Sequence, residues 1–333
     1  MLDELKKLKP DKLNRLIAHA KCLRTPCQDN TEILRAKDRT VIDFIRSNLN
    51  ILTDEHLNSI DKTIIGMDDR EELFSVSKIK KTSSKKAVAL ISEHFFDTNG
   101  KVDLRKTHPY TEKAPGQKLS KYCERFYLQP MAVCSTGTAI SDNYVLITKH
   151  TLRACKEVQK MKLVYGYWYE DDMNITNTLT IDIEEVIKLS LDLALIKTRQ
   201  RIPECYQVEV SEKEYKVNDK VFSAGYPGPE KTSGKYLGIP LKVVSQGKIS
   251  FIEGNKAHYY GHLDVNNRCS GSPVFDEKTQ KLVGIIAKTS LDHFRWNPAC
   301  DGFVSCYYDA SVPKGIKLIS NETILNQLNK IKL

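Results

Sequence analysis

The chain has 333 residues, of which 41% are hydrophobic and 28% are charged, and its formal net charge is +9 at pH 7. This composition is ordinary for a globular protein and supplies enough apolar side chains for a sizeable core. No window approaches 18 apolar residues, so we expect no membrane-spanning helix and no membrane partner. The excess charge is spread along the chain without a basic stripe or interleaved aromatic residues, so we expect no nucleic-acid partner.

The first 20 residues carry acids and lysines throughout and lack the apolar stretch of a signal peptide. Nine cysteines could indicate export, but an odd number without such a signal does not, so we expect a cytoplasmic protein. Cys22 and Cys27 have no Cys or His at zinc-site spacing nearby, and we interpret them as structural thiols. We expect no metal site and no cofactor, because the sequence holds no zinc motif, phosphate-binding loop or dinucleotide-binding glycine set.

Apolar residues recur at helical spacing in the first sixty residues and predict three helices, over 2–20, 31–48 and 53–60. We interpret residues 1–62 as a small helical bundle that forms a domain of its own. Two interpretations are open. The bundle packs on the rest of the chain and stabilises it, or it is an adaptor or regulatory domain on which a protein partner docks.

From residue 63 the pattern changes to short β-rich runs separated by Gly, Asn and Asp turns, which indicates a barrel or a sandwich. We interpret the basic run 78–86 as a solvated linker. A final amphipathic helix is predicted over 320–332, capped by Ser320 or Asn321. The predicted strands comprise residues 87–91, 144–147, 161–165, 178–182, 185–189, 193–196, 220–224 and 281–287.

Three stretches together indicate a nucleophilic serine. Ser270 lies in a Ser-Gly-Ser-Pro turn before an apolar strand, His150 ends an apolar run, and Asp192 lies in a hydrophobic run that we interpret as a strand. A serine hydroxyl is a poor nucleophile unless an imidazole takes its proton and a carboxylate fixes the tautomer of that imidazole. The gaps of 42 and 78 residues leave room for the strands of two small barrels.

In these motifs the chain resembles the bacterial branch of the trypsin-like serine peptidases, in which the three residues also follow the order His, Asp, Ser. The resemblance covers roughly residues 63–318. It implies a mainly β fold, a chymotrypsin-like double β-barrel (first barrel about 84–200, second about 201–318) with a C-terminal helix, in a peptidase domain 63–333. Further segments that carry it are 66–74, 124–130, 134–138, 224–227, 238–242, 263–264 and 283–285.

The resemblance implies a serine endopeptidase that forms an acyl-enzyme with a protein or peptide substrate. His150 would be the general base, Asp192 would orient it, and Ser270 would be the nucleophile rather than Ser272, because the family motif places the nucleophile before the glycine. The backbone N–H groups of Arg268 and Ser270 would form the oxyanion hole. Two positions depart from the family: Arg268 replaces a glycine and Cys269 an acid or amide.

The resemblance also implies a substrate pocket. Asp264 lies six residues before Ser270, where a trypsin-type pocket holds the carboxylate that selects Arg or Lys at the cleaved position (P1). Residues Ile286, Ala287, Lys288 and Thr289 would pair with the substrate backbone as a β-strand. Lys288 would not favour a basic residue, and the absence of histidine from this strand argues against a glutamyl-specific pocket.

Trypsin-like enzymes that are secreted join a cysteine like Cys134 to one directly after the catalytic histidine. That position is Thr151 here, so the resemblance implies that Cys134 forms no such bridge, which supports the cytoplasmic interpretation. Cys300 and Cys306 resemble a pair seen in secreted relatives, and we expect them to be reduced or only facultatively paired.

Two functional hypotheses follow from these patterns. The first is a regulated intracellular endopeptidase, with a loose likeness of residues 1–62 to the helical adaptors of bacterial conflict-system effectors. The second is a catalytically impaired pseudo-protease that binds peptides or a partner protein, which the unusual Arg268 and Cys269 favour. The intact set of His150, Asp192 and Ser270 favours the first.

Overall fold

The computed structural model describes most of the chain after residue 69. The three predicted N-terminal helices, Cys22, Cys27, Cys300 and Cys306 lie outside the described residues. Those described are 70–107, 121–122, 129–155, 157–171, 174–176, 178–227, 240–263, 265, 268–288, 295–297, 302–304 and 316–332.

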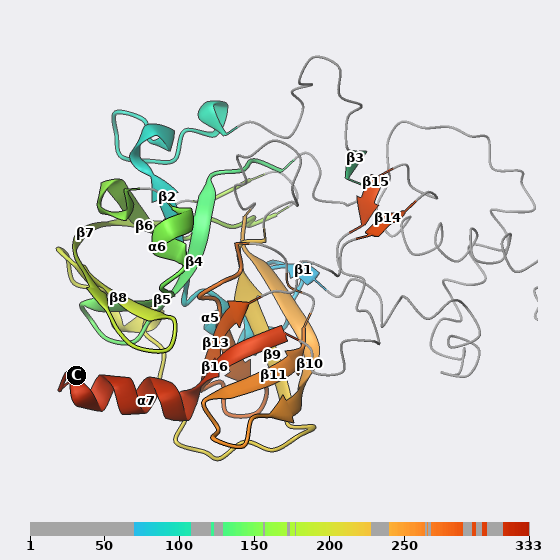
Figure 1. The fold of residues 1–333 in the computed structure, drawn as a ribbon. Helices are drawn as coiled ribbons and strands as arrows, with labels where there is room; N and C mark the ends of the chain where they lie inside the picture. Colours follow the sequence, from blue (N-terminus) through green and yellow to red (C-terminus); the bar gives the residue numbers. More distant parts are fainter. Residues whose placement is uncertain are drawn as a thin grey trace, which may run out of the picture. The chain divides into compact units, whose positions relative to one another are not determined.

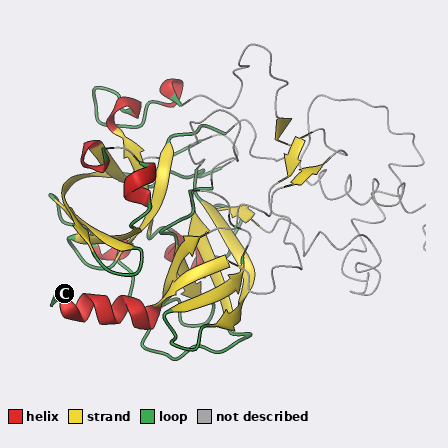
Figure 2. Ribbon diagram, in the orientation of Figure 1, coloured by secondary structure: helices red, strands yellow, loops and turns green. Residues whose placement is uncertain are grey.

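The chain divides into two compact units. The first comprises residues 1–67, 110–128 and 292–312, and its described part is a small sheet in which β15 (Gly302–Val304) pairs with β14 (Arg295–Asn297) and β3 (Lys121–Tyr122). The second comprises residues 68–109, 129–291 and 313–333 and holds all the other described elements. Figure 2 shows that strands dominate this second unit.

Six antiparallel strands close the first barrel of the second unit in the order β2-β4-β5-β8-β7-β6 (Figure 1). Side chains alternate between two cores, as the two-residue period of a strand requires: Val88 and Leu90 of β2 fill the barrel, whereas Ala89 and Ile91 join a second cluster. The strands are β2 (Ala87–Ser92), β4 (Val133–Ala139), β5 (Tyr144–Thr148), β6 (Met161–Tyr165), β7 (Leu179–Lys188) and β8 (Leu193–Thr198).

The second barrel also closes through six strands, in the order β10-β11-β16-β13-β12-β9, because β9 pairs back onto β10. The short β1 (Arg70–Glu72) adds to β10. The apolar interior of this second barrel includes Val221, Ile249 and Val283. The strands are β9 (Lys220–Gly225), β10 (Lys242–Ile252), β11 (His258–His262), β12 (Pro273–Asp276), β13 (Leu282–Lys288) and β16 (Ile316–Ser320).

One apolar cluster contains residues of both barrels and of the C-terminal helix, among them Leu195, Phe275 and Ile324, all fully buried. That helix, α7 (Asn321–Lys330), begins after Ser320, whose hydroxyl accepts a hydrogen bond from the Thr323 N–H at 3.2 Å. The predicted mainly β fold, with two barrels and a C-terminal helix, is therefore confirmed.

Two local predictions were wrong. The predicted strands 178–182 and 185–189 are one strand, β7, in which a bulge between Ile183 and Glu185 shifts the register. The predicted linker 78–86 contains a helix, α5 (Lys78–Ser84), because Ser77 caps its first turn and Ser83 and Ser84 are buried on one side.

In the part of the chain that the structure describes, the remaining short helices are α6 (Thr151–Ala154) and four 3-10 turns. Among the described residues, no helix has the length and apolar character needed to cross a membrane. The 3-10 turns are η1 (Glu93–Phe95), η2 (Leu104–Lys106), η3 (Val158–Lys160) and η4 (Glu204–Tyr206).

Candidate active site

His150 lies between β5 and α6 and is the first residue of a helical turn. Its backbone is already helical, with φ −67° and ψ −21°, and its carbonyl accepts hydrogen bonds from the N–H groups of Arg153 (3.1 Å) and Ala154 (3.0 Å). The histidine is therefore held by its own backbone at the end of a buried strand. Its imidazole projects from a rigid point of the first barrel.

Asp192 lies in the two-residue turn between β7 and β8. Leu191 and Asp192 both have positive φ, 51° and 64°, and the Leu193 N–H donates to the Ser190 carbonyl at 3.0 Å, as in the tight turns that suit twisted hairpins. The prediction that Asp192 lies within a hydrophobic strand was wrong. Its neighbour Leu191 is 49% exposed, and Asp192 itself is half-buried.

Strand register places Asp192 beside His150. Thr148 pairs with Leu193 across β5 and β8, so the residues just beyond them meet, and the Lys149 N–H donates to the Asp192 carbonyl at 2.7 Å. Both carboxylate oxygens of Asp192 face His150. Oδ1 accepts from the His150 N–H at 2.9 Å, and Oδ2 lies 2.7 Å from Nδ1.

This contact fixes the charge of Asp192 and the tautomer of His150. Partial burial by itself opposes ionisation of the carboxyl, but the hydrogen bonds from His150, and the charge of that ring when it is protonated, outweigh it, so the pKa of Asp192 is lowered. An ionised carboxylate only accepts, so Nδ1 is the donor in this hydrogen bond. Nε2 of the neutral ring is then left as an acceptor on the opposite side.

Ser270 occupies that opposite side. Its Oγ lies 2.8 Å from His150 Nε2, so Asp192, His150 and Ser270 form one hydrogen-bonded series. Gly271 follows with φ +87°, and a Cβ there would lie 2.2 Å from the Thr136 carbonyl oxygen, so only glycine fits at this close approach. The rival Ser272 is fully buried.

Three hydroxyls of β4 hold the turn around Ser270, a feature that the sequence analysis missed. Ser135 donates to the Ser270 carbonyl (3.1 Å), Thr136 to the Arg268 carbonyl (3.0 Å) and Thr138 to the Gly271 carbonyl (2.8 Å). All three are buried. Hydroxyls in a buried strand need partners, so their presence is a detectable signal, but the sequence does not say which carbonyls they meet.

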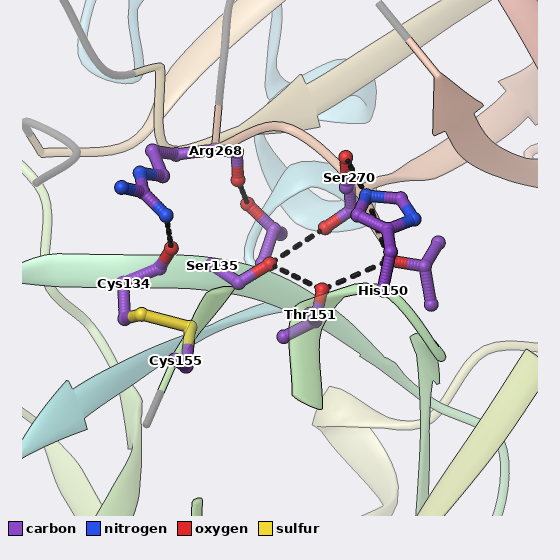
Figure 3. The surroundings of a disulfide bond; sticks show 9 residues. Cys134, Ser135, His150, Thr151, Cys155, Arg268 and Ser270 are labelled. Carbon is purple, nitrogen blue, oxygen red and sulfur yellow. Dashed lines mark hydrogen bonds between the residues drawn. A yellow bond between two sulfur atoms is a disulfide. The ribbon is translucent and has the colours of Figure 1, made fainter. Parts of the chain in front are cut away.

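The same hydroxyls extend toward His150. Thr151 Oγ1 lies 2.9 Å from Ser135 Oγ (both residues are labelled in Figure 3). It also lies 2.8 Å from Thr148 Oγ1, which in turn lies 3.4 Å from His150 Nε2. A buried series of hydroxyls thus connects the carbonyl of Ser270 to the ring of His150. Thr151 is central to it, at the position where the resembling enzymes have a cysteine.

Cys134 forms a disulfide with Cys155, with the two Cα atoms 5.8 Å apart (Figure 3). The family's bridge from Cys134 to the residue directly after the histidine is absent, as predicted, but the inference that Cys134 is reduced was wrong. The second cysteine follows α6 instead of directly following His150, and the helical turn carries it back to β4. The argument for a cytoplasmic location that used Thr151 therefore fails. The free cysteines of the described residues are Cys205, which is exposed, and Cys269, which is buried.

The predicted oxyanion and pocket residues are described in part. Arg268 has φ +75°, the left-handed region that glycine favours, and its Nη1 donates to the Cys134 carbonyl at 3.3 Å. Asp264 and Thr289 lie outside the described residues, as does the side chain of Lys288. Ile286 and Ala287 are buried in β13. Among the described residues, no group of His, Cys, Asp and Glu could hold a metal ion.

The backbone of Ile286 is engaged inside the domain. Its N–H donates to the Ser272 carbonyl at 3.0 Å, and its carbonyl accepts from the Gly271 N–H at 2.8 Å. β13 therefore supports the Ser270 turn through Ile286.

Removing the disulfide should lower stability without changing the fold. Cys134→Ala/Cys155→Ala opens a loop with a sequence separation of 21 residues, so we expect the free energy of unfolding to fall by about 3 kcal/mol. Urea denaturation in non-reducing buffer measures this loss. Reductant should lower wild type to the same value and leave the variant unchanged, with Cys205→Ser as control. Alkylation of both cysteines in unfolded, unreduced wild type would contradict the bridge.

The hydrogen bonds that His150 donates to the Asp192 carboxylate should make stability depend on pH. Its folded pKa is lowered, so its contribution is complete above the unfolded pKa, about 4, and is lost as the pH falls through the folded value. We expect Asp192→Asn to be less stable than wild type at pH 7, and the difference to vanish toward pH 2. Urea denaturation across this range tests it, with Glu185→Gln as a control for loss of one exposed carboxylate. A difference independent of pH would contradict the assignment.

Comparison with known proteins identifies a peptidase domain in this chain. Residues 135–285 match the family model of the trypsin-like peptidase domain. No curated protein matches the chain in sequence. Similar solved structures include the Rv3671c protease of M. tuberculosis in its active form, at 14% identity over 76% of this chain and 84% of that chain, with a TM-score of 0.42.

A second similar structure is an inactive form of Rv3671c from M. tuberculosis H37Rv with serine mutated to alanine, at 12% identity over 81% of this chain and 96% of that chain, with a TM-score of 0.43. Because these identities are low, the assignment rests on the domain match, which runs from β4 to β13 and contains His150, Asp192 and Ser270. The chain therefore carries a trypsin-like peptidase domain, which supports its assignment as a serine endopeptidase.

Proposed function

We propose that Ser270, His150 and Asp192 are the catalytic triad of this endopeptidase. The observation that carries the proposal is the continuous series of hydrogen bonds from Asp192 Oδ2 through His150 to Ser270 Oγ, with distances of 2.7 and 2.8 Å. Both lie within the reach expected of a base and the group that it deprotonates. The lowered pKa of Asp192 keeps its carboxylate charged at neutral pH.

In the first step His150 Nε2 takes the Ser270 proton while Oγ attacks the carbonyl carbon of the scissile peptide. The resulting imidazolium is stabilised by the Asp192 carboxylate, which stays ionised. Collapse of the tetrahedral intermediate breaks the C–N bond, and His150 gives its proton to the leaving amine. Water, deprotonated by the same imidazole, then hydrolyses the acyl-enzyme, which restores the Ser270 hydroxyl and releases the carboxylic acid.

The N–H groups of Arg268 and Ser270 would stabilise the oxyanion of each tetrahedral intermediate. The positive φ of Arg268 supports this assignment, since it gives the residue a backbone conformation that glycine would adopt readily. The Ser270 N–H has no acceptor among the described residues, so it is available to the oxyanion. Loss of one such donor costs roughly 10²–10³ in rate.

We extend the proposal to specificity and context. Asp264 would select Arg or Lys at P1, and residues 287–289 would pair with the substrate backbone. Residues 1–62 would recruit a protein partner or regulate the peptidase domain in a bacterial setting such as a conflict system. These assignments rest on the resemblance and on sequence patterns.

A fluorophosphonate probe tests the triad without a known substrate. We expect it to label purified wild type covalently and to lose the label in Ser270→Ala and His150→Ala, because the probe reads the nucleophilicity of serine. Ser272→Ala, two residues away at a buried hydroxyl, is the matched control and should label like wild type. Wild type that stays unlabelled while folded would favour the pseudo-protease that Arg268 and Cys269 suggest.

Substrate profiling tests the pocket. In a peptide library we expect cleavage after Arg and Lys, and Asp264→Asn should lower kcat/KM for these substrates by about 30-fold or more, since removing one partner of a buried charge pair costs about 2–5 kcal/mol. Substrates with a neutral P1 residue serve as the control. Cleavage after other residues, unaffected by Asp264→Asn, would contradict a basic preference.

A further inference from the structure

Arg268 combines a side chain with a backbone conformation that side chains disfavour. Its φ of +75° lies in the left-handed region, where the Cβ of an L-residue crowds the following carbonyl oxygen. Glycine would adopt this conformation readily. Some interaction in the fold must therefore hold Arg268 where it is.

Two hydrogen bonds tie Arg268 to β4, one at each end of the residue. Its carbonyl oxygen accepts from Thr136 Oγ1 at 3.0 Å, and its Nη1 donates to the Cys134 carbonyl at 3.3 Å (Figure 3 labels Arg268 and Cys134). β4 belongs to the first barrel and is paired on both sides, with β2 and β5, so it is a rigid anchor.

The direction of the Thr136 hydrogen bond is set by a third group. The Tyr226 N–H donates a hydrogen bond to Thr136 Oγ1 at 3.3 Å, which occupies one lone pair of that oxygen. The hydroxyl proton of Thr136 therefore points to the Arg268 carbonyl. Thr136 is fully buried, and water does not compete for this bond. The bond fixes the peptide plane between Arg268 and Cys269.

We propose that Thr136 is a positioning residue that holds Arg268 in its left-handed conformation and so keeps the Arg268 N–H in the oxyanion hole. This inference rests on the proposed function. If the carbonyl is released, Arg268 relaxes toward negative φ, which turns the preceding peptide, with its N–H, relative to Ser270. The threonine thereby takes over the part that glycine plays at this position in the resembling enzymes.

The effect should fall on turnover and not on substrate binding. The oxyanion exists only in the tetrahedral intermediates and their transition states, so a misplaced donor lowers kcat and leaves KM nearly unchanged. We expect Thr136→Val, which removes the hydroxyl at constant shape, to lower kcat about 10- to 100-fold, less than complete loss of a donor. Thr136→Ser keeps the hydroxyl and should retain activity.

A double-mutant cycle with Arg268→Gly separates positioning from a general structural role. Glycine needs no tether, so Thr136→Val should cost less than about 3-fold in kcat when residue 268 is glycine. Thr138→Val, which removes the hydroxyl that holds the Gly271 carbonyl, is the matched control, and its cost should be the same with Arg or Gly at 268. An equal cost of Thr136→Val in both backgrounds would overturn the proposal.

Two further measurements separate this proposal from the failure of the proposed function. Thermal melts identify variants that do not fold, and Thr136→Ala replaces Thr136→Val in that case. Crystal structures of wild type and the Thr136 variant report on Arg268 without any activity. We expect φ at residue 268 to become negative in the variant. A retained positive φ would refute the tether even if wild type were unreactive toward the probe.

Discussion

The contact between β4 and the turn at 268–271 is the constraint on which the site depends. His150 and Asp192 belong to the first barrel and Ser270 to the second, so the 2.8 Å contact between Nε2 and Oγ spans two separately closed sheets. The apolar cluster shared by the barrels holds them together, but apolar contacts are not directional and do not fix the orientation of a side chain. Directional hydrogen bonds from β4 fix the orientation of the turn, and the close approach at Gly271 leaves little room for it to shift.

Part of the backbone strain lies next to the reacting groups, where three of the eight described side-chain-bearing residues with positive φ are found. Leu191, Asp192 and Arg268 all have positive φ, and each costs roughly 1–2 kcal/mol as a side-chain-bearing residue. At Asp192 two hydrogen bonds from His150 offset that cost, and at Arg268 the two bonds to β4 do so. The strain is thus balanced by the same contacts that orient the imidazole and the turn, which is the pattern expected of a functional site.

How much of this could be predicted from the sequence depends on whether the signal is local. Strands such as β6 and the cap of α7 at Ser320 follow from periodicity and residue type, and the order of His150, Asp192 and Ser270 indicated two barrels. The turn at Asp192 could not be predicted from the sequence, because the leucines on either side give the pattern of a strand. Nothing local reveals that Leu191 points to solvent. The β4 hydroxyls could not be assigned partners more than 130 residues away.

The disulfide shows the same limit and changes the interpretation of the compartment. The resembling enzymes have the second cysteine at the position of Thr151, but here α6 brings Cys155 to Cys134, and Thr151 instead joins Ser135 and Thr148 in the buried hydroxyl series. Disulfides persist mainly in oxidising compartments, so this bridge weighs against the predicted cytoplasmic location. The backbone carbonyl of Cys134 also accepts a hydrogen bond from the Arg268 guanidinium. Cys134 therefore contacts both sides of the site: its side chain is bonded to Cys155 at the end of α6, and its backbone carbonyl is bonded to the turn that carries Ser270.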